Sequence, residues 1–235
     1  MLTFVAAMVA QGLAGFGAVA VAMIYTVVVH GPKALEGPKA VDTLMKQSLP
    51  LMLLLAMLAT GLAVYLCARL FVWGRLREIG VAPAPLGATL GWAAAGVAMA
   101  AAYLLLAARL VPPDPHAPAG PLAQLAAEGG LAKVALAIAA VILAPPIEEL
   151  LFRGMLFTGF ARSWGRVAAT IASTALFVVL HLADTWHYWP GIVVITLMAL
   201  LTLAARLKTG SLVTSWAVHA AYNTVLVVAT YTMTR

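Results

Sequence analysis

The chain has 235 residues, of which 64% are apolar and only 9% are charged, and its mean hydropathy is +1.02. Soluble globular domains carry about 25% charged residues, so this composition excludes an ordinary soluble domain and indicates a membrane protein. The formal net charge is +6, and the Lys and Arg residues lie mostly in short connecting segments without forming a basic run. This pattern argues against a nucleic-acid partner and for contact with lipid headgroups.

The first half of the chain contains three segments that are long and apolar enough to span a bilayer, which takes about 20 mainly apolar residues. These predicted spans are residues 2–29, 49–73 and 86–111. Three glycines in the first span favour close helix packing over a cleaved signal peptide, and Gly87 and Gly91 give the third span a GxxxG packing pattern. Residues 30–48 mix Gly, Pro and charged residues, which predicts a loop with a surface-lying piece.

The second half contains four further apolar segments, which follow a polar, Pro-rich loop. These predicted spans are residues 131–160, 167–182, 192–207 and 212–231. Pro145 and Pro146 interrupt the first of them, because proline has no backbone N–H and favours the start of a helix. We therefore predict an all-α, polytopic membrane helix bundle of about seven spans, in which the Pro-interrupted span carries Glu148 and Glu149.

Three short basic loops, at residues 75–77, 162–166 and 206–208, are separated from one another by two spans each. They are therefore expected on the same side of the membrane. Lys and Arg are nearly balanced between the two sides, so the positive-inside rule gives these loops, and the amino terminus with them, only a slight preference for the cytoplasm.

Ionisable residues within the predicted spans form three short motifs. A charged side chain near the bilayer centre is costly, so such residues are expected to be buried in the bundle and functional. The motifs are Glu148-Glu149-x-x-x-Arg153, Phe177-x-x-x-His181 and His219-x-x-x-Asn223. Each contains an i,i+4 step, which places both members on one helix face. Glu149 precedes Arg153 by four residues, which predicts an ion pair and leaves Glu148 as the freer carboxylate.

The motifs are also predicted to lie at similar depths in the membrane. Counted at about 1.5 Å per residue from the side of the basic loops, four of the side chains lie about 12–21 Å deep. They are Glu148, His181, His219 and Asn223. The remaining ionisable residues of this kind, His30, His116, His187 and Asp184, fall in predicted loops, where a solvated role is expected.

These three motifs, in this order on successive membrane helices, resemble the CPBP family (CAAX protease and bacteriocin-processing, or Abi) of intramembrane proteases. The resemblance covers residues 131–231 as a catalytic core, with residues 1–111 as additional spans of the single membrane domain 1–235. It implies that Glu148 is a general base that activates water together with His181. It further implies that His219 and Asn223 stabilise the oxyanion, while Glu149, Arg153 and Phe177 support the site.

The same family has been described as metalloproteases, and Glu148, His181 and His219 with a water would be an acceptable zinc set. The sequence lacks an HExxH pair, however, and the same histidines can act without a metal. We therefore expect no cofactor, with zinc as the less favoured alternative.

Two classes of function fit these residues. The first is an intramembrane endopeptidase that processes the tail or leader of a membrane-associated peptide or protein. The alternative is a non-proteolytic transporter or scaffold with a buried Glu/His/Arg network, but transporters usually have duplicated halves and none is evident here. The expected partners are a peptide substrate and the lipid bilayer, with no nucleic acid and the oligomeric state left open. The high Ala content and the lack of organelle signals favour a bacterial inner membrane.

Overall fold

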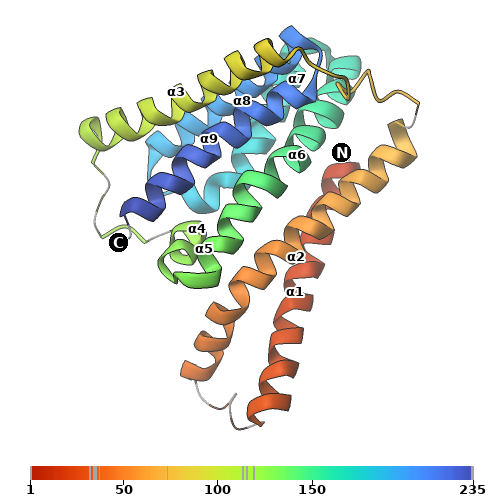
Figure 1. The fold of residues 1–235 in the computed structure, drawn as a ribbon. Coiled ribbons are helices and arrows are strands. Elements are labelled where there is room, and N and C mark those ends of the chain that lie inside the picture. The colour runs from red at the N-terminus through yellow and green to blue at the C-terminus, as the bar shows by residue number, and fades with distance from the viewer. Residues whose placement is uncertain are drawn as a thin grey trace.

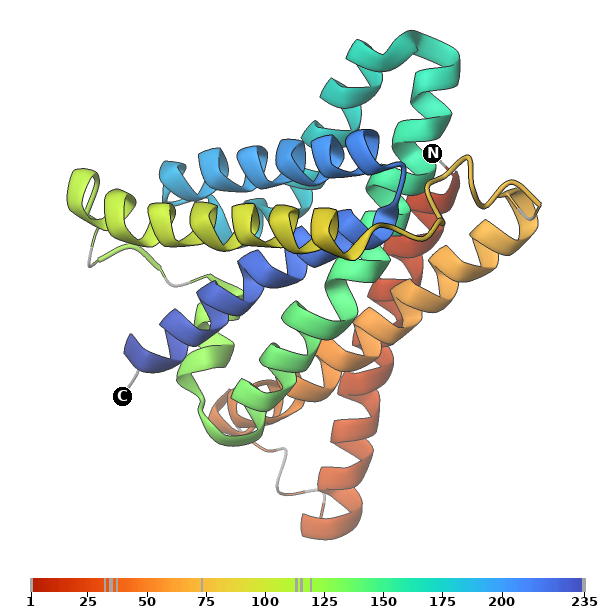
Figure 2. The same ribbon diagram turned by 45° about the horizontal axis from the view of Figure 1, so that its top comes forward.

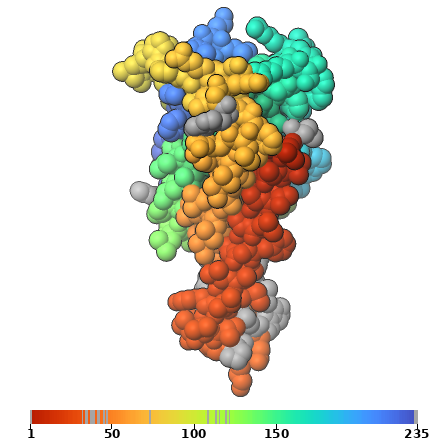
Figure 3. Space-filling view, turned by 90° about the vertical axis from the view of Figure 1, so that its right-hand side faces the viewer, coloured from red at the N-terminus to blue at the C-terminus, as the bar shows by residue number. Residues whose placement is uncertain are grey.

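The computed structural model describes residues 2–31, 33, 36, 38–72, 74–112, 114, 116–118 and 120–233. Two long helices, α1 (Leu2–His30) and α2 (Pro38–Val72), form an antiparallel hairpin at one side of the molecule. The far end of this hairpin extends beyond the remaining helices (Figures 1 and 3). α1 matches its predicted span. α2 begins within the predicted loop at residues 30–48, and its predicted end at Trp73 lies outside the described residues.

The rest of the chain is helical as well. After α3 (Leu86–Leu110) and the short α4 (Pro121–Ala127), a continuous run comprises α5 (Gly130–Ala137), η2 (Ile138–Leu143), α6 (Ala144–Glu148), η3 (Glu149–Leu156) and α7 (Phe157–Thr185), followed by α8 (Trp189–Thr209) and α9 (Leu212–Met233). Six helical stretches of the described chain are long and apolar enough to cross a membrane. The protein is therefore an all-α, multi-pass membrane protein, as predicted. α4 was missed because it lies in the Pro-rich loop.

One of the six stretches, Gly130–Thr185, is 56 residues long. A straight helix of that length would extend about 84 Å, far more than the about 30 Å of a bilayer's hydrocarbon core. The chain reverses direction within it at Gly165, which has φ 80° and ψ 168°, a conformation that only glycine adopts readily. Figure 2 shows the two arms of this hairpin. The stretch therefore makes two crossings, which gives the predicted total of seven.

The connecting segments gather at two opposite ends of the bundle. At one end, the backbone N–H of Leu212 donates to Gly80 O at 2.7 Å, and Arg206 Nη2 donates to Glu78 O at 3.1 Å. At the other end, Tyr188 Oη donates to Val111 O at 2.7 Å. The basic loops thus share one end with the segment before α3, which confirms that they lie on the same side of the bundle.

Glycine packing differs from the prediction. No heavy atom outside the local helix lies within 4 Å of an added Cβ at Gly87 or Gly91, so the GxxxG pattern does not pack on another described helix. The glycines of α1 are also in open or ordinary surroundings. The close approach occurs instead at Gly96 in α3, where an added Cβ would lie 2.5 Å from Val218 O in α9. Only glycine lets α3 approach the backbone beside His219 this closely.

We expect Gly96→Ala to lower the free energy of unfolding by about 1–3 kcal/mol, the usual effect of inserting a methyl group into a packed interface. Gly91→Ala, five residues earlier in the same helix, is the matched control. Its Cβ would meet open space, so stability should not fall and should rise by up to about 1 kcal/mol, because Ala favours a helix over Gly. Thermal unfolding in detergent measures both. Equal melting temperatures for the two variants would show that α3 does not pack against α9 in this register.

Candidate active site

The two prolines of the glutamate motif change the hydrogen bonding of their helix without ending it. The chain is π-helical in η2, just before the prolines, and again in η3, just after them. Within η2 the N–H of Ala144 donates to Ala139 O, five residues back. The expected break is thus wrong in form, because helical backbone dihedrals continue through Glu148 and Glu149. Neither glutamate lies at the start of a separate helix. Single π-turns of this kind are frequent at functional sites.

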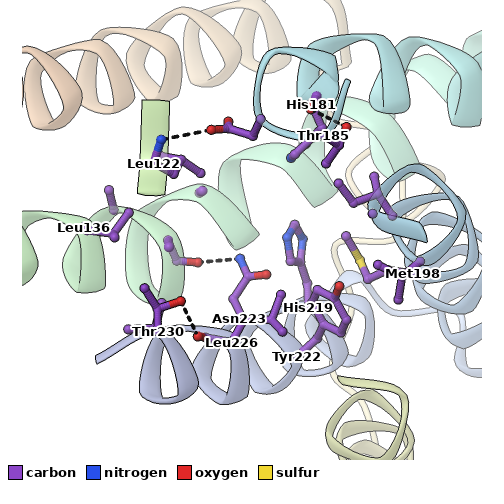
Figure 4. Close-up of a pocket in the computed structure, with 18 of the residues that line it drawn as sticks. Leu122, Leu136, His181, Thr185, Met198, His219, Tyr222, Asn223, Leu226 and Thr230 are labelled. Atoms are coloured by element: carbon purple, nitrogen blue, oxygen red, sulfur yellow. Dashed lines mark hydrogen bonds between the residues drawn. The ribbon is translucent and has the colours of Figure 1, made fainter. Parts of the chain in front are cut away.

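Asn223 satisfies the carbonyl that the prolines leave without a donor. The next bond of the π pattern would join residue 145 to Ala140 O, but Pro145 has no N–H. Asn223 Nδ2 donates to Ala140 O instead, at 2.7 Å (Figure 4). An unpaired carbonyl would be costly in a bilayer, where no water replaces the missing donor. Asn223 therefore joins α9 to η2 and still has a second amide N–H.

Glu149 is the most connected acid of the site. Its side chain is 1% exposed, and its Oε1 lies 3.0 Å from His219 Nδ1 and 3.2 Å from Arg153 Nη1. The Glu149–Arg153 contact is the ion pair that the spacing predicts. The contact with His219 comes from α9 and was not predicted. A neutral His219 that donates from Nδ1 to this carboxylate carries its lone pair on Nε2, whereas a protonated His219 presents an Nε2–H.

Glu148 faces the opposite nitrogen of the same imidazole and is the freer carboxylate, as predicted. Its side chain is 20% exposed, and its Oε2 lies 3.9 Å from His219 Nε2. This separation is too long for a hydrogen bond and well within the reach of one bridging water. Adjacent residues of one helix thus approach the two ring nitrogens of His219 in different ways. Glu149, at Nδ1, is enclosed by protein, whereas Glu148, at Nε2, lines the cavity.

His181 comes from α7 and also lines the cavity. Its Nδ1 lies 2.8 Å from Phe177 O, which makes Nδ1 the donor, because a carbonyl can only accept. In the neutral imidazole the lone pair is then on Nε2. His181 therefore has the tautomer that accepts a proton or a hydrogen bond at Nε2.

Phe177 is the packing centre of the three motifs. It is fully buried, and its ring stacks on His181 with centroids 4.5 Å apart and meets His219 edge-on at 6.0 Å. The guanidinium carbon of Arg153 lies 4.2 Å from the same ring centroid. Aromatic faces attract cations, most strongly in desolvated surroundings. The phenyl ring thus fixes both histidines and covers the charge of Arg153, which is more than the packing role expected.

These side chains adjoin a cavity of about 350 Å³. Figure 4 shows His181 and Thr185 on one wall and His219, Tyr222 and Asn223 on another, with Leu136, Leu226 and Thr230 toward the far end. Glu148, His181, His219 and Asn223 all line it, so the predicted convergence is observed. Arg153 and Phe177 are buried behind the wall.

Sequence reasoning missed several polar residues of this cavity, among them Tyr103, Tyr222 and Asp184. Asp184 was expected in a solvated loop, but α7 continues to Thr185 and brings Asp184 to the wall of the cavity. Its spacing of three residues from His181 was the available signal, because residues i and i+3 share a helix face. Tyr222 has the same spacing from His219 within the third motif.

The side chains that the sequence suggested as zinc ligands are not arranged around a common point. No group of three His, Cys, Asp or Glu side chains in the described part of the chain is arranged to hold a metal ion, and this includes Glu148, His181 and His219. The residues as placed thus do not fit the zinc centre considered from the sequence, and no step of the chemistry below is assigned to a metal.

Comparison with known proteins supports the resemblance of the three motifs. Residues 130–225 match the family model described as type II CAAX prenyl endopeptidase Rce1-like. The match confirms the resemblance to the CPBP family. It begins at the start of α5 and ends two residues after Asn223, so it contains all three motifs. No curated protein and no solved structure matches the chain.

Arg153→Ala should destabilise the protein by about 3–5 kcal/mol, because it leaves Glu149 buried without its cation. Arg153→Lys should be partly tolerated, since lysine keeps the charge without the planar fork. The control is Arg162→Ala, which removes the ion pair with Glu78 whose members are 52% and 48% exposed, and should cost about 1 kcal/mol or less. Chemical unfolding in micelles gives these values. Equal effects at the two arginines would contradict the buried pair.

Asn223→Ala should destabilise the protein by about 1–3 kcal/mol, because it leaves the partly buried Ala140 carbonyl without this donor. The loss of unfolding free energy caused by Asn223→Ala should be smaller when Pro145→Ala is also present, since residue 145 then has an N–H that can reach the Ala140 carbonyl. A double-mutant cycle of unfolding free energies isolates this coupling. Additive effects of the two substitutions would argue against the link between Asn223 and the proline-interrupted hydrogen bonding.

Proposed function

We propose that the chain is an intramembrane endopeptidase that hydrolyses a peptide bond at or within the membrane. The observation that carries the proposal is the meeting of Glu148, His181, His219 and Asn223 at one cavity within the region that matches the Rce1-like family. These side chains come from helices far apart in the sequence. Peptide hydrolysis needs a base for water and donors for the developing oxyanion, and the four residues offer both kinds of group.

In the proposed mechanism, Glu148 and His181 activate the water. Glu148 is partly exposed to the cavity, and a neutral His181 carries its lone pair on Nε2 when its Nδ1 donates to Phe177 O. A carboxylate and an imidazole that both accept can orient one water and take its proton as the oxygen attacks the carbonyl carbon. The same carboxylic acid then delivers the proton to the leaving nitrogen as the C–N bond breaks.

The oxyanion is proposed to form beside His219 and Asn223. Asn223 can donate its second amide N–H, because the first is held by Ala140 O. His219 can donate only from Nε2, and this requires the protonated imidazole when Nδ1 donates to Glu149. The contact of Nδ1 with the carboxylate of Glu149 holds the ring so that Nε2 faces Glu148. Glu149 thus acts through His219 as an orienting residue, without contacting the substrate.

The setting and substrate follow the sequence expectation. We place the protein in a bacterial inner membrane, where it would process the tail or leader of a membrane-associated peptide or protein in sorting or maturation. The cavity supports a largely apolar substrate segment, because most of its lining side chains are Leu, Val, Ile, Met and Ala.

Substitution of the two glutamates tests the proposal. Glu148→Gln should lower cleavage by at least about a hundredfold while leaving folding intact, because the amide cannot accept the proton of water. Glu149→Gln should lower activity less and stability more, since it weakens the contacts with Arg153 and His219. The measurement is the appearance of new protein termini in a deletion strain complemented with each variant, together with the melting temperature of the purified proteins.

Three results of this test have distinct meanings. Normal cleavage by folded Glu148→Gln with an inactive Glu149→Gln would reverse the two roles. Normal cleavage by both variants would contradict the protease proposal. Loss of wild-type activity with a chelator, restored by zinc, would contradict the proposal of metal-free chemistry.

A further inference from the structure

Apart from its two histidines, the ionisable groups that line the cavity are all acidic or phenolic. Its lining contains two carboxylates, those of Glu148 and Asp184, and no Lys or Arg among the described residues. This contrasts with the chain as a whole, whose formal net charge is +6. Arg153, the cation of the motif, is buried behind Phe177 and does not reach the cavity.

Asp184 has the position of a subsite on the cavity wall. It lies one turn after His181 on the same face of α7 and is partly buried. Its Oδ1 accepts a hydrogen bond at 2.9 Å from the N–H of Leu122, at the start of α4 (Figure 4). It makes no ion pair with the described residues, so its charge is not neutralised by the protein. A carboxylate accepts several hydrogen bonds, which leaves acceptor capacity for a ligand.

The distance from the reacting groups fixes the register of this subsite. Three residues along α7 correspond to a rise of about 4.5 Å. An extended peptide advances about 3.3 Å per residue, so a group that meets Asp184 belongs to a residue about one or two positions from the bond at His181 and Glu148.

We propose that Asp184 is a specificity-determining residue that selects substrates with a positively charged side chain, Lys or Arg, within two positions of the cleaved bond. The inference rests on the proposed peptidase function. An amine or guanidinium would complete a charge-assisted hydrogen bond with Asp184, while its aliphatic stem packs along the apolar wall.

The same charge pattern disfavours a free C-terminal carboxylate near the cleaved bond. A CAAX sequence ends in such a carboxylate three residues after its cysteine. In this cavity it would meet Asp184 as a like charge, and no Lys or Arg among the described lining residues would compensate it. The substrate of this chain is therefore assigned as an internal, apolar segment flanked by a basic residue.

The first test maps cleavage sites in a complex peptide mixture. Purified protein in liposomes is given peptides produced by cutting a bacterial proteome after glutamate, which leaves Lys and Arg internal, and new termini are identified by mass spectrometry. The wild type should enrich Lys or Arg within two positions of the cleaved bond by about two- to fivefold, the range of a partly exposed charge pair. Asp184→Asn should abolish this enrichment, since an amide keeps the acceptor for Leu122 N–H but lacks the charge.

The matched control is Asp114→Asn, at an exposed residue whose Oδ1 also accepts a backbone N–H, that of His116 at 2.8 Å. This variant should keep the wild-type preference. An enrichment that is absent in the wild type, or that persists in Asp184→Asn, overturns the inference. A preference lost in both variants would also overturn it, because the effect would then not depend on the cavity.

A binding measurement makes the inference testable even without cleavage. Labelled apolar peptides that differ only by Lys or Gln at one of three central positions are titrated into Glu148→Gln protein, with and without Asp184→Asn. The Lys peptide should bind about two- to fivefold more tightly at one position, and only when Asp184 is present. Equal affinities overturn the charge selection. Retained selectivity with no cleavage by the wild type would contradict the peptidase function alone.

Discussion

The carboxylate of Glu149 is the interaction on which the rest of the site depends. It contacts Arg153 from its own helix and His219 from α9, at 3.2 and 3.0 Å, with almost no exposure. A charge in such surroundings persists only when its partners are held in place, because no water is present to replace them. The pairing therefore fixes the rotation of η3 against α9. That rotation points the neighbouring Glu148 into the cavity and the Nε2 of His219 toward it.

Pro145 and Pro146, beside this pair, also leave a polar group that needs a partner from another helix. They remove backbone donors within a membrane-embedded helix, and the π-type pattern of η2 displaces the remaining bonds by one residue. The helix keeps its direction because Asn223 supplies a donor from α9. One residue thus serves both the backbone of the glutamate helix and the wall of the cavity. Errors in the α6–α9 register would break the ion pair and this hydrogen bond together.

The sequence predicts the spans well, because the thickness of a bilayer imposes a minimum apolar length that few soluble segments reach. The span expected at 86–111 is Leu86–Leu110, and that at 212–231 is Leu212–Met233. The form of the proline segment was not predictable, since it depends on an amide 83 residues away in sequence. Gly96 was missed because the spacing of glycines in a sequence shows only where a helix could be approached closely. The helix that actually approaches, here α9, is known only from the fold.

The sequence identifies those site residues that are ionisable and lie inside a predicted membrane span. It misses those that lie just beyond the end of a predicted span. Glu148 and His181 are conspicuous because a bilayer centre excludes ionisable groups unless protein surrounds them. Asp184 lies only three residues after His181, yet a carboxylate beyond a predicted helix end resembles any solvated loop residue. Its position became informative once α7 extended to Thr185.

The arrangement of charge separates stability from recognition. Arg153 compensates the buried Glu149 from behind the aromatic ring of Phe177, so the cation that stabilises the fold is hidden from the cavity. If Arg153 lined the cavity, it would neutralise the carboxylate field there and attract anionic groups of a substrate. Because it does not, the carboxylates of Glu148 and Asp184 have no Lys or Arg beside them among the described lining residues. A low-dielectric wall strengthens such a field, so two carboxylates are enough to make this apolar cavity selective for charge.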